Sequence, residues 1–126
     1  MVARLGDGRV WNRSKGSLLA ERLERALHPW QRLRGLLGRR TFLPGEALWI
    51  EPCRSVHTFF MRFAIDVLFL DGEGRVVEAI RELRPYRATR FFRRAVGVLE
   101  LPAGTIAASG TEPGDRIDLS GAETQR

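Results

Sequence analysis

AIDVLFLDGEGRVVEAI, residues 64–80, is the segment from which the fold of this chain can be worked out. Residues 64–70 are apolar except for Asp66, as in a β-strand. Two glycines in the following Asp71-Gly72-Glu73-Gly74 can adopt the left-handed φ angles of a tight turn. Apolar residues then return in 75–80. The segment therefore predicts a β-hairpin.

Further short apolar segments lie on both sides of this hairpin, separated by glycine, proline and aspartate. They predict strands over 47–51, 96–101 and 116–119. Residues 17–27 carry leucines at helical spacing but fit a strand equally well, so both structures stay open there.

Two segments favour helix. Pro29 suits a first helical position, leucines recur at helical spacing after it, and Gly38 can end the helix, which predicts a helix over 29–38. Pro102 and Gly110 enclose a second candidate, a helical turn over 103–109.

The chain of 126 residues has the length of one domain. Its composition, 44% hydrophobic and 29% charged, is that of an ordinary globular protein and not of a disordered one. We expect a single domain over 1–126, with a core over about 11–120 and a loose tail over 121–126. The expected fold class is α+β and mainly β: a compact, barrel-like antiparallel or mixed sheet with one short helix and a helical turn.

Charged residues interrupt the longest apolar run, so we expect no membrane-spanning helix and no membrane partner. Residues 1–10 lack the apolar core of a signal peptide. A single cysteine, Cys53, cannot form an internal disulfide. These features predict a cytoplasmic protein.

The net charge of +6 comes almost entirely from arginine, because Lys15 is the only lysine. Residues 1–45 carry ten basic and three acidic side chains, and residues 84–94 hold a second basic cluster. Such a charge attracts nucleic acid or anionic lipid without specificity. A general preference for arginine over lysine also explains this composition, and we favour that explanation over nucleic-acid or lipid binding.

Candidate site residues lie in CRSVHTFFMRFAID, residues 53–66. His57 and Asp66 are ionisable groups among apolar neighbours, where burial is costly without partners. We favour a role in anchoring a loop through backbone hydrogen bonds over a role in a ligand site. A bend near Phe63 would bring the polar residues of this segment together. We expect Asp66 to be largely buried and bonded to backbone N–H groups, such as those of the Phe63 bend, or to the side chain of Thr58 or Arg62.

Glu100 is a further polar residue in an apolar run. Strand alternation turns it away from the face used by Leu99 and Leu101, so it is either exposed or the partner of a cation such as Arg62. The candidate ligand-binding residues are His57, Thr58, Met61, Arg62, Asp66 and Glu100.

Metal binding and nucleophilic catalysis have weaker support. Glu51, Cys53 and His57 could be metal ligands, but a zinc site needs partners at matching spacing, and only His28 is left over. Cys53 with His57 as its base lacks any surrounding motif. We therefore assign no metal, no other cofactor and no catalytic residue.

RPYRATRFFRR, residues 84–94, interleaves five arginines with three aromatic residues. Guanidinium groups bind phosphates and rings stack on bases, which is the combination that single-stranded nucleic-acid sites use. We favour a solvated connection between strands, because no nucleic-acid-binding fold accompanies the segment.

Four motifs together resemble the bacterial and archaeal family known as domain of unknown function 192, DUF192 or UPF0127. The likeness covers about residues 11–120 and runs through RGLLGR (34–39), VHTFFMRFAIDVLFLD (56–71), VLELPAG (98–104) and the final Gly114-Asp115. The resemblance implies a compact, β-rich, barrel-like fold with a short helix, and it implies no activity. The family pattern marks His57, Thr58, Met61, Asp66, Glu100 and Gly104, whereas Ala64 stands where relatives often have proline.

Three functions follow in order of preference. The first is a non-catalytic binding module for a small polar or peptide-like ligand. The second is an enzyme, either a hydrolase or an isomerase, that uses Asp66 or His57 as general base. The third is nucleic-acid binding through the arginine-rich surface.

Overall fold

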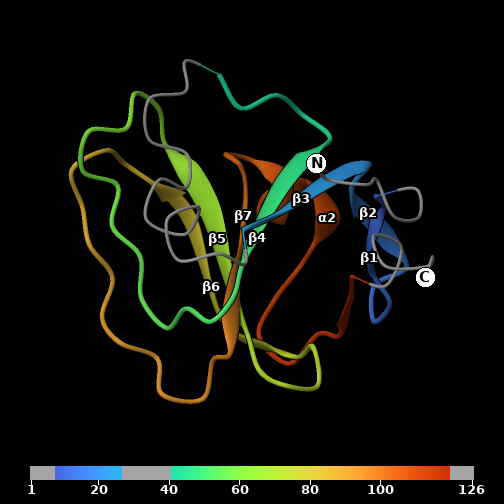
Figure 1. Cartoon of the computed structure of the whole chain (residues 1–126). Coiled ribbons are helices and arrows are strands. Elements are labelled where there is room, and N and C mark those ends of the chain that lie inside the picture. Colours follow the sequence, from blue (N-terminus) through green and yellow to red (C-terminus); the bar gives the residue numbers. More distant parts are fainter. Residues whose placement is uncertain (1–7, 27–40, 120–126) are drawn as a thin grey trace.

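The structure, a computed structural model, describes residues 8–26 and 41–119 (Figure 1). Those residues form eight strands and one short helix. The elements are β1 (Val10–Asn12), β2 (Ser17–Ala20), β3 (Arg22–Ala26), β4 (Glu46–Ile50), β5 (Ile65–Leu70), β6 (Val76–Leu83), β7 (Gly97–Pro102), α2 (Thr105–Ser109) and β8 (Ile117–Asp118).

A five-stranded sheet in the order β3-β4-β7-β5-β6 forms the centre of the molecule. Only the β3–β4 pair is parallel within this sheet, so the sheet is mixed, as expected. β5 and β6 form the predicted hairpin, and Gly74 in its turn has a φ of 82°. Every residue of β5 and of β7 is buried, which fits strands that are covered on both faces.

A smaller sheet in the order β2-β1-β8 joins the N-terminal segment to the end of the described chain. The two sheets stay separate, so the described residues form no closed barrel. The barrel-like arrangement that we expected is therefore not confirmed, whereas the mainly β composition with a short helix is.

In the segment over 17–27, for which both structures were open, residues 17–20 and 22–26 form strands β2 and β3, and residue 27 lies outside the described residues. The expected helical turn over 103–109 is α2. The helix expected over 29–38 and the tail over 121–126 lie outside the described residues.

Each face of the large sheet carries a cluster of buried apolar side chains. The first face packs against α2 through Ile106 and extends to the small sheet through Val10 and Ile117. On the second face, Val67 and Val98 pack with Met61 and Phe92, which come from the long connections between strands. Those connections therefore cover one side of the sheet.

Trp49 explains why β7 begins with a glycine. A Cβ atom on Gly97 would lie 2.4 Å from the Trp49 ring and 2.9 Å from the Ile50 carbonyl oxygen, closer than real contacts allow. The indole Nε1–H of Trp49 donates to Glu51 Oε1 at 2.9 Å, which holds the ring in this position.

Two connections, residues 51–64 and 84–96, run side by side as an irregular antiparallel ribbon (green and orange in Figure 1). Backbone hydrogen bonds link them along their length. At one end the Cys53 N–H donates to the Val96 carbonyl at 3.1 Å, and at the other the Thr58 N–H donates to the Arg87 carbonyl at 2.8 Å. The ribbon thus continues from the β4–β7 pair and carries most of the candidate site residues.

Candidate functional site

Asp66 is fully buried, on the face of the sheet that packs against α2. Its Oδ2 atom accepts the N–H of Gly104 at 3.1 Å and the N–H of Ile106 at 2.8 Å, in the first turn of α2. Its Oδ1 atom accepts the N–H of Glu82 at 2.8 Å. Both oxygens are therefore engaged by backbone donors, and the expectation that Asp66 is buried and bonded to backbone N–H groups is confirmed.

The donors to Asp66 come from elements distant in sequence, and not from the bend near Phe63 that we considered. Glu82 lies in a β-bulge of β6, where the pairing shifts between Ile65 and Val67, and its φ is 52°. Gly104 has a φ of 101° immediately before α2. Asp66 therefore fixes a bulge and a helix start, which explains the glycine at position 104.

Thr58 is fully buried and joins the two connections of the ribbon. Its hydroxyl donates to the Arg84 carbonyl and accepts the Arg87 N–H at 2.9 Å. Its carbonyl accepts the Tyr86 N–H at 2.9 Å, and its own N–H donates to Arg87. One threonine thus determines the path of residues 84–87.

Thr58→Val is expected to lower the free energy of unfolding by about 2 kcal/mol, because it removes the hydroxyl and leaves buried backbone groups unpaired. Thr58→Ser keeps the hydroxyl and is the matched control, with an expected loss of about 1 kcal/mol or less from the missing methyl group. Denaturant unfolding of both variants measures the difference. Equal losses of unfolding free energy in Thr58→Val and Thr58→Ser would show that Thr58 stabilises the fold through packing and not through its hydrogen bonds.

Glu100 lies on the opposite face of the sheet from Asp66. It is paired with Leu48 and Val67, whose side chains belong to the cluster beneath the ribbon, together with Met61. Its side chain is only 5% exposed, and no group among residues 8–26 and 41–119 donates a hydrogen bond to its carboxylate. Burial raises the pKa of Glu100 to about 7.

The six candidate residues therefore do not meet in one site. His57, Thr58, Met61 and Arg62 lie on the ribbon, where His57 and Arg62 are exposed and the other two are buried. Asp66 lies beneath α2, and Glu100 lies beneath the ribbon without the Arg62 partner that we considered. The chain does bend at residues 62–63, as expected, but this bend brings neither acid to the surface.

An exposed aromatic cluster at one end of the ribbon is the feature that the sequence analysis missed. The rings of His57 and Phe59 are stacked with centroids 5.1 Å apart, and Tyr86 lies 6.4 Å from Phe59 and 5.7 Å from Phe60. Phe60 is 72% and Tyr86 56% exposed. Large apolar side chains gathered on a surface mark interaction sites more often than single ones do.

The backbone holds two of these rings outward in a costly conformation. Phe60 has a φ of 68° and Tyr86 a φ of 63°, in the left-handed region that bulky residues rarely adopt. Strained residues of this kind are concentrated at functional sites, where the surrounding structure maintains them. Here Thr58 does so, since its carbonyl accepts the N–H groups of Met61 and Tyr86.

Arginine is the only charged residue type on the ribbon between positions 53 and 63 and between 84 and 94. All seven of these side chains are exposed, and none pairs with a carboxylate in the part of the chain that the structure describes. They are Arg54, Arg62, Arg84, Arg87, Arg90, Arg93 and Arg94. Together with His57, Phe59, Phe60 and Tyr86 they form what we call the ribbon surface.

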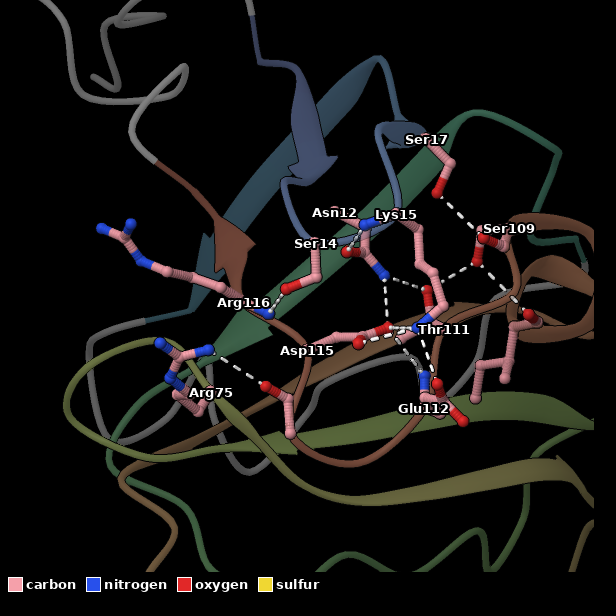
Figure 2. A network of polar contacts seen from close by, with 12 residues as sticks. Asn12, Ser14, Lys15, Ser17, Arg75, Ser109, Thr111, Glu112, Asp115 and Arg116 are labelled. Carbon is pink, nitrogen blue, oxygen red and sulfur yellow. Dashed lines mark hydrogen bonds and ion pairs between the residues drawn. The ribbon is translucent and has the colours of Figure 1, made fainter.

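A second group of polar residues joins the small sheet to the turn that follows α2 (Figure 2). The side-chain amide of Asn12 donates to Thr111 Oγ1 and Asp115 Oδ2, both at 3.0 Å. Lys15 Nζ donates to Asp115 and to Glu112 at 2.8 Å. The network therefore holds the β1–β2 hairpin against residues 111–115 and explains Asp115 of the sequence pattern. Gly114 beside it has a φ of 93°.

This network has the electrostatics of a structural clamp. The hydrogen bonds that Lys15 donates to Asp115 and then to Glu112 raise the pKa of Lys15, so its ammonium group is protonated and not nucleophilic at neutral pH. Partial burial alone would raise the pKa of Asp115, but hydrogen bonds from Asn12 and Lys15 bring it below its usual value. The charges of Lys15, Glu112 and Asp115 are thus paired with one another within the network.

Other kinds of site find little support in the described residues. No three histidine, cysteine, aspartate or glutamate side chains gather there as metal ligands would. Cys53 Sγ donates to the Ser55 carbonyl at 3.0 Å. No helix within 8–26 or 41–119 is long and apolar enough to cross a membrane.

The fold and its surfaces define a small, mainly β domain in which an arginine-rich ribbon covers one face of a mixed sheet. The chain belongs to the DUF192 family of uncharacterised proteins, whose model matches residues 10–119. A UPF0127 protein of Thermococcus sibiricus is 33% identical over 114 residues, 85% of this chain and 71% of the relative. One from Pyrococcus furiosus is 44% identical over 64 residues, 51% of this chain and 54% of the relative.

Two crystal structures are similar to the whole domain. One is a proposed transcription regulator of Sinorhizobium meliloti, with a TM-score of 0.73, 26% sequence identity and coverage of 90% of this chain and 92% of that one. The other is a protein of unknown function from Novosphingobium aromaticivorans, with a TM-score of 0.75, 20% identity and coverage of 87% and 81%. At 20% identity, the similarity to the Novosphingobium aromaticivorans protein concerns the fold alone.

Proposed function

We propose that this chain is a non-catalytic binding module whose ligand lies on the ribbon surface. The ligand carries negative charge and flat apolar groups. One observation carries the proposal: Phe60 and Tyr86 hold their rings out in left-handed backbone conformations, among seven arginines that have no acidic partner within the described residues.

The chemistry of this surface supports such a ligand. Exposed ring faces attract flat apolar groups, which remove them from water. A guanidinium group presents several donors in one plane and binds carboxylate or phosphate in a bidentate manner. No carboxylate on the ribbon competes for these donors, and Arg54, Arg87 and Arg90 each give only part of their donor capacity to a backbone carbonyl, so an anionic ligand can still bind the guanidinium groups.

A small polar or peptide-like ligand at all six sequence-predicted residues has less support, since Asp66 and Glu100 lie on opposite faces of the sheet. Within the ribbon surface, His57 and Arg62 are available to such a ligand. Thr58 and Met61 would act beneath it as positioning residues.

An enzyme that uses Asp66 as general base is also less well supported. Both carboxylate oxygens of Asp66 accept backbone hydrogen bonds and the side chain is fully buried, so a substrate proton has no access to it. Among the described residues, no carboxylate orients His57, whose Nδ1 atom accepts the Phe59 N–H at 3.3 Å. Asp66 therefore anchors the fold, and His57 is exposed and available to a ligand of the ribbon surface.

The proposal can be tested with the dye 1-anilinonaphthalene-8-sulfonate, which combines flat rings with an anionic group. We expect saturable fluorescence enhancement with the parent protein and at least a tenfold weaker apparent affinity in the Phe60→Ala/Tyr86→Ala double variant, since two ring contacts together contribute about 2 kcal/mol. Both rings are exposed, so the melting temperature should change little.

Leu43→Ala is the matched control, because Leu43 is an exposed apolar residue outside the ribbon. It should leave dye binding unchanged. Equal dye binding by the parent and the double variant would contradict the proposal, as would the absence of any binding to the parent.

A further inference from the structure

We infer that the ligand of the ribbon surface is single-stranded nucleic acid. The inference rests on the proposed function and narrows its ligand from any flat anion to a polymer of bases and phosphates. It follows from the shape of the surface, its charge and the accessibility of its rings.

The ribbon surface is elongated, with aromatic rings near one end and arginines along its length. Aromatic rings gather where Thr58 meets Arg87, whereas Arg54, Arg90, Arg93 and Arg94 lie toward the other end, where the Phe92 N–H donates to the Arg54 carbonyl at 2.8 Å. Arg54 and Thr58 are four positions apart, which is a length of about 13 Å in an extended chain. A small anion can contact only one part of this strip, but a linear polyanion can follow it.

The two kinds of side chain on the strip correspond to the two parts of a nucleotide. Stacking on an aromatic ring requires an open base face, and proteins that bind single strands provide such rings next to a positively charged track. Phe60 provides an open ring in edge contact with Tyr86, and Arg62, Arg84 and Arg87 flank these rings in the sequence. The guanidinium groups would bind the phosphates between stacked bases.

Arginine stacking on rings occurs elsewhere on the same ribbon. The guanidinium carbon of Arg90 lies 4.2 Å from the centroid of Phe92, and that of Arg54 lies 6.0 Å from the centroid of Phe91. These contacts hold flat cationic groups at the surface at a position suited to phosphate contact.

A single strand fits this surface better than a duplex. Base faces are closed in a duplex, and reading its major groove takes a helix or a two-stranded arm shaped to enter it. The helix within the described residues, α2, is only five residues long. The two-stranded ribbon packs on the sheet through Met61 and Phe92, so it is not a projecting arm that could enter a groove. The exposed rings would therefore remain unused on a duplex, but they would stack on unpaired bases.

The test is fluorescence anisotropy of the full chain with short labelled oligonucleotides of mixed sequence, as single-stranded RNA, single-stranded DNA and duplex DNA, between about 50 and 200 mM salt. We expect the single strands to bind more tightly than the duplex. If three phosphates are contacted, the log–log dependence of affinity on salt has a slope of about −2.

Two variants separate stacking from charge. Phe60→Ala should weaken single-strand binding about tenfold without changing the slope with salt, because it removes one stacked base. Arg87→Ala should weaken binding and reduce the slope by about 0.7. Arg116 is an exposed arginine just before β8, outside the ribbon surface. Arg116→Ala removes the same charge there and should change neither the affinity nor the slope.

The outcomes distinguish this inference from the proposed function. Dye binding that depends on the rings, with no binding of oligonucleotides at low salt, would leave the proposed function standing and overturn the inference. Equal affinity for duplex and single strand, or oligonucleotide binding that Phe60→Ala does not change, would also overturn it, because stacking would then play no part. Binding to vesicles of anionic lipid in place of oligonucleotides would identify a membrane surface as the partner and would likewise reject it.

Discussion

Asp66→Ala is expected to lower the free energy of unfolding by about 3 kcal/mol, the largest loss that we expect from a single substitution in this domain. The substitution leaves three backbone donors, of Glu82, Gly104 and Ile106, without their acceptor. Glu82 lies in the bulge of β6, and Gly104 and Ile106 lie at the start of α2, so the loss should extend beyond one element. Denaturant unfolding at neutral pH gives the magnitude.

Asp66→Asn provides the matched comparison. It retains one acceptor oxygen in a side chain of nearly the same size, so its cost should be about half that of Asp66→Ala. Amide hydrogen exchange should show faster exchange at Gly104 and Ile106 in the alanine variant. An alanine variant as stable as the parent would show that solvent replaces the carboxylate and that Asp66 does not anchor the fold.

Glu100→Gln is expected to stabilise the domain by about 3 kcal/mol at pH 8 and to have little effect near pH 4. Burial raises the pKa of Glu100 from 4.5 to about 7. Below the pKa of Glu100 in the unfolded state, the carboxyl group is protonated in both the folded and the unfolded protein, and it contributes no pH dependence to stability. As the pH rises from about 4.5 to 7, the unfolded state releases the proton before the folded state does, so stability falls and then levels off above pH 7.

Glutamine resembles the protonated carboxyl group in size and cannot titrate, so it removes this dependence. The measurement is the difference in unfolding free energy between variant and parent across pH 4 to 8. That difference isolates Glu100 from the other titrating groups, including Asp115, whose lowered pKa makes its contribution fade only below about pH 4. A difference independent of pH would show that the buried carboxylate has found a compensating donor in solution.

The strands of the central sheet were predictable because their signals are local. The apolar run at 64–70, the turn with two glycines and the apolar run after it required only the alternation and turn preferences of nearby residues. The segment over 17–27 was not predictable in this way, since its leucines at helical spacing also suit a strand. Pairing of β3 with the parallel strand β4 decides in favour of strand there.

Burial of Asp66 was predictable for the same reason, because an acid within an apolar strand must find hydrogen-bond donors. The identity of its donors was not. Glu82, Gly104 and Ile106 lie 16 to 40 positions away in the sequence, and a bulge and a helix start bring them to the carboxylate.

The sequence alone determined the hairpin, the mainly β character and the family, because these depend on periodicity, turn residues and motif order. Only the tertiary structure decided which polar residues share a surface. Asp66 lies in β5 and Glu100 in β7 of the same sheet. Asp66 pairs with Leu101 and Val67 pairs with Glu100, so the two acidic side chains lie on opposite faces of the sheet. The rings of Phe60 and Tyr86 meet for the converse reason: hydrogen bonds through Thr58 bring together two loops that a whole hairpin separates in the sequence.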